Sequence, residues 1–189
     1  MDSITYTGEF LPEEQWLGPQ GMVPGFGDPS LPASADLVGR TVEVVFEDGK
    51  VIRHEFHSQN ELTWTVLNAK EEAKSGTQTY RAVEVRPQIF FVDFLKGDNL
   101  KTRDVSIVID FSDGDVTVAE TRFVNRNGEV RTHTDLRAGR IDGMGDVAPR
   151  PRSEGLVGKR VYYRYSPTDA YEHLYLNPET FLWHCVKGG

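Results

Sequence analysis

The sequence predicts an all-β protein, in which an antiparallel meander closes into a barrel and is followed by the start of a second, duplicated β-unit. Three observations support this fold class. From Arg40 onward, apolar and polar residues alternate with period two in about eight consecutive segments that are joined mostly by tight turns. No segment carries a convincing helical pattern. A stretch near the C-terminus repeats the start of the meander, which indicates an internal duplication.

The composition excludes several classes of protein and of binding site. The chain has 189 residues, 38% of them hydrophobic, which suits one large domain or one domain and part of another. Its net charge of −8 argues against a nucleic-acid partner or an anionic membrane, because both require a basic surface. The single cysteine, Cys185, excludes a disulfide framework and a cysteine-based metal site within one chain. A single cysteine fits a reducing compartment.

The N-terminal sequence MDSITYTGEF lacks the basic and apolar regions of a signal peptide, and no apolar run is long enough for a transmembrane helix. We therefore expect a cytoplasmic protein. Residues 1–36 are rich in proline and glycine and predict an arm with at most one helical turn, at Pro12–Leu17. The arm is apolar enough either to pack along the outside of the barrel or to form a lid over its mouth.

The first barrel is predicted over residues 37–137. The Asp48-Gly49 and Asn127-Gly128 pairs are its clearest hairpin signals, because the turns that suit twisted strands need positive φ angles. Eight meandering strands close into a barrel without free edges, and its interior is just wide enough for one small ligand. The expected strands are TVEVVF, VIRHEF, ELTWTVLN, TQTYRAVEVR, QIFFVDFL, VSIVIDF, DVTVAETRFV and EVRTHTDL.

Residues 138–155 contain several glycines and prolines and predict a linker. Residues 156–189 then hold three expected strands, VYYRY, YEHLYLN and FLWHCV. Three strands are too few for a closed barrel. Either this second unit is incomplete in the sequence, or its strands join the first sheet; we favour the incomplete unit.

The duplicated stretches are Leu37–Lys70 and Leu156–Gly189, which align without a gap at an offset of 119 residues. Six of the 34 aligned positions are identical, and the matches keep one strand parity. The identical pairs are Leu37/Leu156, Val38/Val157, Gly39/Gly158, Val42/Val161, His54/His173 and Trp64/Trp183.

Strand parity decides which side chains share a face. The first copy's apolar set, expected to face the interior, is Val42, Val44, Phe46, Ile52, His54, Phe56, Leu62, Trp64 and Val66. The second copy's set is Val161, Tyr163, Tyr165, Tyr171, His173, Tyr175, Phe181, Trp183 and Cys185. If this set also faces an interior, four tyrosine hydroxyls and one imidazole lie inside. Their hydrogen-bond partners would be a polar ligand, or one another and trapped water.

Several of these residues have a structural alternative to a functional role. His54 and His173 occupy equivalent positions, which suits hydrogen-bonded core histidines as well as a catalytic one. Asp169 lies in a turn, where it either reaches a barrel mouth or caps the turn. Cys185 is expected to be a small buried hydrophobe. The opposite parity holds a set that is also typical of a solvated outer face: Arg164, Glu172 and His184.

The sequence offers no motif for a cofactor. It has neither a Walker loop nor a glycine-rich turn of the dinucleotide-binding type after a strand. His54 and His57 have opposite parity on one strand, and His173 and His184 also differ in parity, so neither pair suits a shared metal ion. We therefore predict no cofactor and no metal.

The segment GKRVYYRYSPTDAYEHLYLNPETFLWHC resembles the signature of the MoaF-like family, with YSPTDAYEHLYLN and WHC as its specific strings. The resemblance implies a lipocalin-like (calycin) β-barrel whose second unit forms its own domain. The family name has been tied to molybdenum cofactor biosynthesis, a role that no cysteine cluster or nucleotide loop of this chain supports. A fainter likeness to the phenolic acid decarboxylases rests on their Tyr-x-Tyr, which holds a substrate carboxylate and corresponds here to Tyr163 and Tyr165.

Two functions fit these features, and a third alternative stays open. The first is a cofactor-independent enzyme (a lyase, decarboxylase, isomerase or cyclase) acting on a small aromatic or carboxylate-bearing molecule. Its predicted catalytic residues are Tyr163, Tyr165, His173 and Glu172, and its predicted ligand-binding residues are Tyr171, Tyr175, Trp183, Asp169 and His184. The second is a non-catalytic binding or carrier protein with the same pocket. The third is packing or homo-oligomerisation, which an exposed strand edge at Phe181–Val186 would favour.

Overall fold

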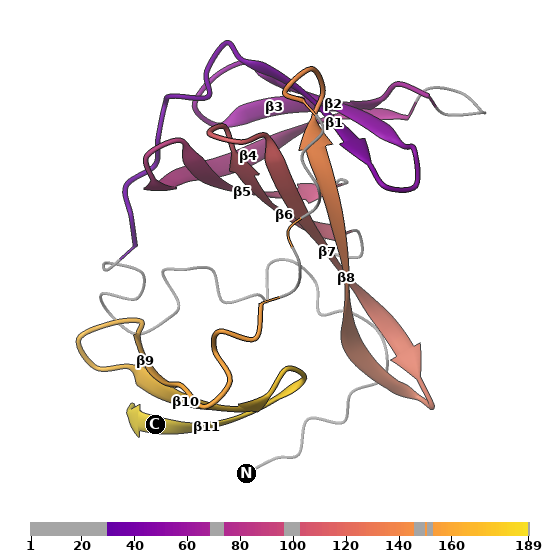
Figure 1. Cartoon of the computed structure of the whole chain (residues 1–189). Coiled ribbons are helices and arrows are strands. Elements are labelled where there is room, and N and C mark those ends of the chain that lie inside the picture. Colours follow the sequence, from indigo (N-terminus) through magenta and orange to yellow (C-terminus); the bar gives the residue numbers. More distant parts are fainter. Residues whose placement is uncertain (1–29, 69–73, 97–102, 146–149, 151–152, 189) are drawn as a thin grey trace, which may run out of the picture. The chain divides into compact units, whose positions relative to one another are not determined.

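The computed structural model describes residues 30–68, 74–96, 103–145, 150 and 153–188. These residues form eleven β-strands and no helix, as Figure 1 shows. The strands are β1 Thr41–Phe46, β2 Val51–Phe56, β3 Glu61–Val66, β4 Ser75–Arg86, β5 Ile89–Lys96, β6 Arg103–Asp110, β7 Asp115–Arg126, β8 Glu129–Ile141, β9 Arg160–Arg164, β10 Ala170–Asn177 and β11 Thr180–Lys187. The chain divides into two compact units, one holding β1–β8 and the other β9–β11.

The first unit is a closed antiparallel barrel in which β1 to β8 pair in chain order. The predicted all-β meander is therefore confirmed. All nine residues expected to face inward from the first three strands are at most 8% exposed, because alternate side chains of a strand point to opposite faces. Positive φ angles at Gly49, Asn127 and Gly128 confirm the two predicted hairpin turns.

The barrel closes between β1 and β8, at the pairs Val44↔Ile141, Val45↔Arg140 and Phe46↔Gly139. β8 therefore runs beyond Ala138, where the sequence predicted that a linker begins. The glycine at 139 explains the difference. A Cβ atom there would lie 2.8 Å from Cγ1 of Val44, so this glycine marks a close approach of two strands rather than a flexible connection.

Strands β7 and β8 form a long hairpin that pairs continuously from Asp115↔Arg140 to Arg126↔Glu129. Its turn end extends past the other strands of the barrel (Figure 1). Along this hairpin the inward-facing positions change from apolar residues, such as Val116 and Val118, to charged ones. The β7–β8 hairpin thus gives one end of the barrel charged inward-facing positions. The shorter strands, in which inward positions are mostly apolar, provide few such positions.

The described part of the N-terminal arm lies along β4. The backbone N–H of Ser34 donates to the carbonyl of Ala82 at 2.9 Å, and the guanidinium of Arg81 donates to the carbonyl of Leu31 at 2.8 Å. Leu37, where the arm meets the barrel, is fully buried. These contacts agree with an arm packed on the barrel; the predicted helical turn at Pro12–Leu17 lies outside the described residues.

The second unit repeats the backbone of the first three strands. The N–H of Gly39 donates to the carbonyl of Phe56, and the N–H of Gly158 donates to the carbonyl of Tyr175, both at 2.8 Å. The strand registers also coincide, with the rows Val42–His54–Trp64 and Val161–His173–Trp183. This coincidence supports the internal duplication. Strands β9–β11 form a three-stranded sheet of their own.

In the part of the chain that the structure describes, no helix is long and apolar enough to cross a membrane.

Candidate functional site

One face of the β9–β11 sheet is covered by aromatic rings, and we call it the aromatic face. Cross-strand pairing brings the rings together, because residues directly opposite on antiparallel strands lie close on the same side. The His173 imidazole stacks on Phe181 with ring centres 4.7 Å apart, and Tyr171 lies 5.5 Å from Trp183. The members of the aromatic face are Tyr163, Tyr165, Tyr171, His173, Tyr175, Phe181 and Trp183.

The aromatic face contains a hollow of about 370 Å³ that is open to solvent. This volume is within the usual range of about 300–1,000 Å³ for small-molecule sites. Trp183 is 62% exposed, although its counterpart Trp64 in the barrel is buried. The same parity therefore gives a filled core in the first unit and an accessible face in the second. The hollow is lined by Tyr165, Tyr171, His173, Phe181 and Trp183.

The hydroxyls of Tyr163 and Tyr175 lie 2.8 Å apart and share a hydrogen bond. This hydrogen bond, with a smaller effect of burial, raises the pKa of Tyr163 above the ordinary value for a tyrosine. Tyr163 is therefore a protonated phenol near neutral pH, which can donate or accept a hydrogen bond. Its ring centre lies 4.5 Å from that of His173, so the structure brings these two predicted catalytic residues together.

Glu172 and His184 lie on the opposite face of the sheet. The Glu172 carboxylate forms an ion pair with Arg160, and His184 Nε2 lies 3.3 Å from its second oxygen. The hydrogen bond from Arg160 lowers the pKa of Glu172. Because strand parity directs them away from the aromatic face, Glu172 and His184 do not join Tyr163 and His173 in one site.

Asp169 lies in the turn between β9 and β10. The buried Ser166 organises this turn, since its Oγ accepts the backbone N–H groups of Thr168 and Asp169 at 3.0 and 2.9 Å. Ser166 Oγ also donates to the Asp169 carboxylate at 3.2 Å. Ser166 is thus the side chain that caps this turn, and the Asp169 carboxylate accepts a hydrogen bond from it.

Cys185 was expected to be buried, and this expectation is wrong: its thiol is exposed. The residue keeps the parity of the aromatic face, but it lies on β11, an outer strand of the three-stranded sheet. An outer strand has a neighbouring strand on one side only, so parity alone does not bury this residue.

The described residues of the barrel interior line a cavity of about 20 Å³, which is room for about one water molecule. Aromatic and branched side chains such as Phe94 and Ile107 are part of its lining. Polar and charged residues also line this cavity, and they include His54, Trp64, Lys96, Glu120 and Arg137.

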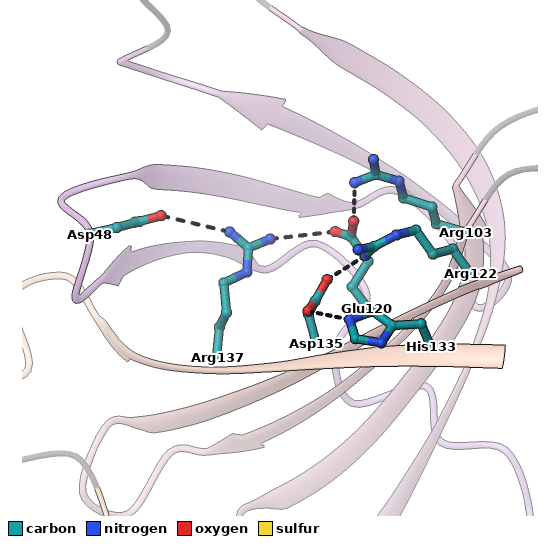
Figure 2. A network of polar contacts seen from close by, with 7 residues as sticks. All are labelled: Asp48, Arg103, Glu120, Arg122, His133, Asp135 and Arg137. Atoms are coloured by element: carbon teal, nitrogen blue, oxygen red, sulfur yellow. Dashed lines mark hydrogen bonds and ion pairs between the residues drawn. The ribbon is translucent and has the colours of Figure 1, made fainter. Parts of the chain in front are cut away.

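The buried Glu120 is the centre of an ion-pair network at the charged end of the barrel, which Figure 2 shows. It is 6% exposed, forms an ion pair with Arg103, and accepts a hydrogen bond from Arg137 at 3.4 Å. Arg137 also lies 3.9 Å from Asp48. Next to them, Asp135 pairs with Arg122 and with His133. Sequence reasoning missed this network; the shared parity of Glu120 with Val116 and Val118 was the available signal.

His54 is 3% exposed, and burial lowers its pKa to about 4. The Val42 carbonyl near the ring opposes this effect, and the Lys96 charge adds to it. Within the described residues, neither His54 Nδ1 nor Trp64 Nε1 has a hydrogen-bond partner of acceptable geometry. The sequence favoured a hydrogen-bonded core role for His54, and the ring nitrogen without a partner is an unexpected finding.

No group of three or more histidine, cysteine, aspartate or glutamate side chains that could hold a metal ion occurs within the described residues.

Comparisons with known proteins agree with the sequence resemblance. The family model of the MoaF N-terminal domain matches residues 14–125, and that of the MoaF C-terminal domain matches residues 150–189. Protein MoaF of Klebsiella aerogenes is 31% identical over 121 residues, a match that covers 58% of this chain and 46% of that protein. The chain thus matches about half the length of this curated relative.

Among solved structures, a crystal structure of a candidate beta-lactamase from Burkholderia vietnamiensis matches with a TM-score of 0.43 and 15% sequence identity. The match covers 56% of this chain and 94% of the other.

Proposed function

The chain belongs to the MoaF family, and from this premise we propose that its second unit binds a small aromatic molecule on the aromatic face. The observation that carries the proposal is the solvent-open hollow of about 370 Å³ lined by Tyr165, Tyr171, His173, Phe181 and Trp183. Exposed clusters of large apolar side chains mark binding surfaces, because leaving them in water is unfavourable.

A planar ligand suits this hollow better than a flexible aliphatic one. The rings lining the hollow meet at varied angles, with Tyr165 and Tyr171 edge-to-face and Tyr171 and Trp183 tilted. An additional ring can therefore make both stacked and edge contacts with them. Each such contact contributes about 0.5–1.5 kcal/mol beyond the burial of apolar area.

A hydrogen-bond acceptor on the ligand would add specificity. Tyr163 and Tyr175 have one hydroxyl proton each, and their shared hydrogen bond uses only one of the two. Neither tyrosine lines the hollow, but the Tyr163 ring centre lies 4.5 Å from that of His173, which does, so in this proposal the other proton serves a carbonyl or carboxylate oxygen at the edge of the ligand. This feature supports a ligand that combines an aromatic ring with such a group.

Isothermal titration calorimetry with 4-hydroxybenzamide tests the proposal, with 4-hydroxycyclohexanecarboxamide as the non-aromatic counterpart. We expect saturable binding of the aromatic amide and markedly weaker binding of its counterpart. Trp183→Leu should weaken binding by about tenfold, whereas Leu182→Ala, a change on the opposite face, should leave it unchanged. Equal affinities for the two amides, or an unaffected Trp183→Leu variant, would refute binding on the aromatic face.

A cofactor-independent enzyme at the same site is the second candidate. The proximity of the protonated Tyr163 phenol to the His173 imidazole favours it, because one group can polarise a carbonyl or carboxylate while the other transfers a proton. The reaction class is a lyase, decarboxylase, isomerase or cyclase on a small aromatic or carboxylate-bearing substrate.

Mass spectrometry of a panel of aromatic acids and ketones incubated with the protein tests for a product. Where a product forms, Tyr163→Phe should abolish most of the turnover. Tyr162→Phe, which removes an exposed hydroxyl on the opposite face, should not. Binding without any product favours the carrier function, and turnover that survives in Tyr163→Phe excludes the role assigned to this residue.

Association of two copies through β11 is the remaining candidate. β11 is an outer strand of its sheet and is exposed along its whole length, which favours pairing with another strand. Light scattering over a range of protein concentrations tests it, and a monomer at every concentration would exclude it.

A further inference from the structure

Lys96 is a cation without an acidic partner at the charged end of the barrel. It is the last residue of β5, and its side chain is part of the lining of the small barrel cavity. Among the described residues, no carboxylate forms an ion pair with the Lys96 ammonium. Charged side chains that are withdrawn from water usually have such a partner, so an unpaired ammonium at this position is unexpected.

Cations predominate around Lys96. Strands β5 and β6 pair so that Lys96 lies directly opposite Arg103, and like charges in this arrangement repel each other. Among the described charged groups that act on the ammonium, three are cations, at Lys50, Arg103 and Arg137. The fourth is the Glu120 carboxylate, which already binds Arg103 and Arg137. No carboxylate of the described residues is therefore dedicated to Lys96.

This environment favours the neutral amine over the ammonium. Burial is the main cause that lowers the pKa of Lys96, and the three cations lower it further, while Glu120 opposes them only in part. The Trp64 ring centre lies 4.1 Å from Nζ and also attracts the charged form, but less strongly than a paired carboxylate would. A lysine of lowered pKa has a larger fraction of neutral amine near pH 7, and the neutral amine is the nucleophilic form.

The amine can be reached from solvent. Lys96 is half-buried, and its ammonium is only partly withdrawn from water. The adjoining cavity of about 20 Å³ holds no more than a water molecule. A reagent therefore has to approach Nζ from outside the barrel, and the group that it adds stays outside the cavity.

We infer that Lys96 is a nucleophilic amine that forms an imine with small aldehydes. The neutral Nζ attacks the carbonyl carbon with its lone pair, a C–N bond forms, and one proton passes from nitrogen to the former carbonyl oxygen. The hydroxyl then leaves as water with the second nitrogen proton, and a C=N bond forms. The adjoining cavity has room for the water that is released. The inference does not depend on the function proposed for the aromatic face.

Butanal is the probe for this site, because it carries its carbonyl on a short, uncharged chain. The protein is incubated with butanal and sodium cyanoborohydride near neutral pH, so that each imine is reduced to a stable amine, and peptide mass spectrometry locates the alkylated lysines. We expect Lys96 to react about threefold faster or more than lysines that are more accessible. The lysines for this comparison are exposed: Lys74, Lys159 and Lys187.

Trace acetylation with acetic anhydride at several pH values separates a reactive amine from an accessible one. The rate rises with pH until the amine is fully neutral, so its midpoint should lie at lower pH for Lys96 than for the exposed lysines. Arg103→Gln removes the cation opposite Lys96 and should slow its acetylation near neutral pH by about twofold or more. Arg53→Gln removes a cation that pairs with Glu43 on the outer side of the barrel, and the rate at Lys96 should not change.

The inference is overturned if butanal alkylates Lys96 no faster than the exposed lysines, if the acetylation midpoint of Lys96 lies at or above theirs, or if Arg103→Gln leaves the rate at Lys96 unchanged. The first two comparisons use the unaltered protein, so they hold even if the Arg103 variant folds poorly.

Discussion

Acidification should destabilise the barrel through His54. The imidazole is buried, and its pKa in the folded protein is about 4, compared with 6.5 for an unperturbed histidine. Between these two pH values the unfolded chain binds a proton that the folded barrel does not bind. Stability is therefore complete above about pH 6.5 and falls as the pH decreases towards 4.

The size of the effect follows from the difference between the two pKa values. One pKa unit corresponds to about 1.4 kcal/mol, so His54 accounts for a loss of about 3 kcal/mol between pH 6.5 and 4. Below about pH 4 the folded protein also takes up the proton, and the contribution of His54 stays constant.

Urea unfolding measured at several pH values, in buffers without carboxylates, tests this prediction. The NMR signal of the Trp64 indole N–H reports whether the barrel is folded. The variant His54→Phe keeps an aromatic ring next to Phe94 and removes the titrating group, so its stability should depend on pH by about 3 kcal/mol less. His57→Phe is the matched control, because His57 is exposed and its ring forms a hydrogen bond with the exposed Thr63 hydroxyl outside the core.

Carboxylates also lose stabilising contacts in acid. The relevant quantity is therefore the difference between the variants in how much unfolding free energy they lose from pH 6.5 to 4. If His54→Phe and the unaltered protein lose the same stability between pH 6.5 and 4, the reasoning from burial is wrong. The same conclusion follows if His57→Phe reproduces the effect of His54→Phe.

Three further substitutions test other parts of the structure. Gly139→Val should destabilise the barrel by about 1–3 kcal/mol in urea unfolding, because its side chain would overlap Val44; an unchanged midpoint would contradict this packing. Glu120→Gln should cost about 1.5–3 kcal/mol by the same assay, whereas Glu129→Gln, in an exposed ion pair, should cost under about 1 kcal/mol. Glu172→Gln should leave 4-hydroxybenzamide affinity unchanged in calorimetry, and a large loss would place its carboxylate at the aromatic face.

The strands could be predicted because this fold depends on a local pattern. Alternation with period two identifies both the strand and its buried side, as the inward set from Val42 to Val66 demonstrates. The pattern fails where long-range contact decides the outcome. Glycine in the sequence usually interrupts a strand, but Gly139 continues β8 because β1 approaches it closely.

The candidate sites were less predictable, since parity gives the side of a strand but not what covers it. His54 and His173 have the same parity and register, yet one is buried in a closed barrel and the other lies on an accessible face. The sequence analysis did not single out the inward-facing charges Lys96, Glu120 and Arg137. Only the closed barrel shows that they surround a cavity.

The repeated register also bears on how the chain avoids misfolding. β8 closes the barrel against β1, but β9 carries the same strand pattern and could offer an incoming strand a similar backbone ladder. Repeats with interchangeable partners tend to assemble wrongly. Side-chain size differs between them: a Cβ atom at Gly139 would lie 2.8 Å from Val44, and the second copy carries the larger Tyr163 at the position equivalent to Val44. We therefore expect β9 to be a poorer partner than β1 for β8 during folding.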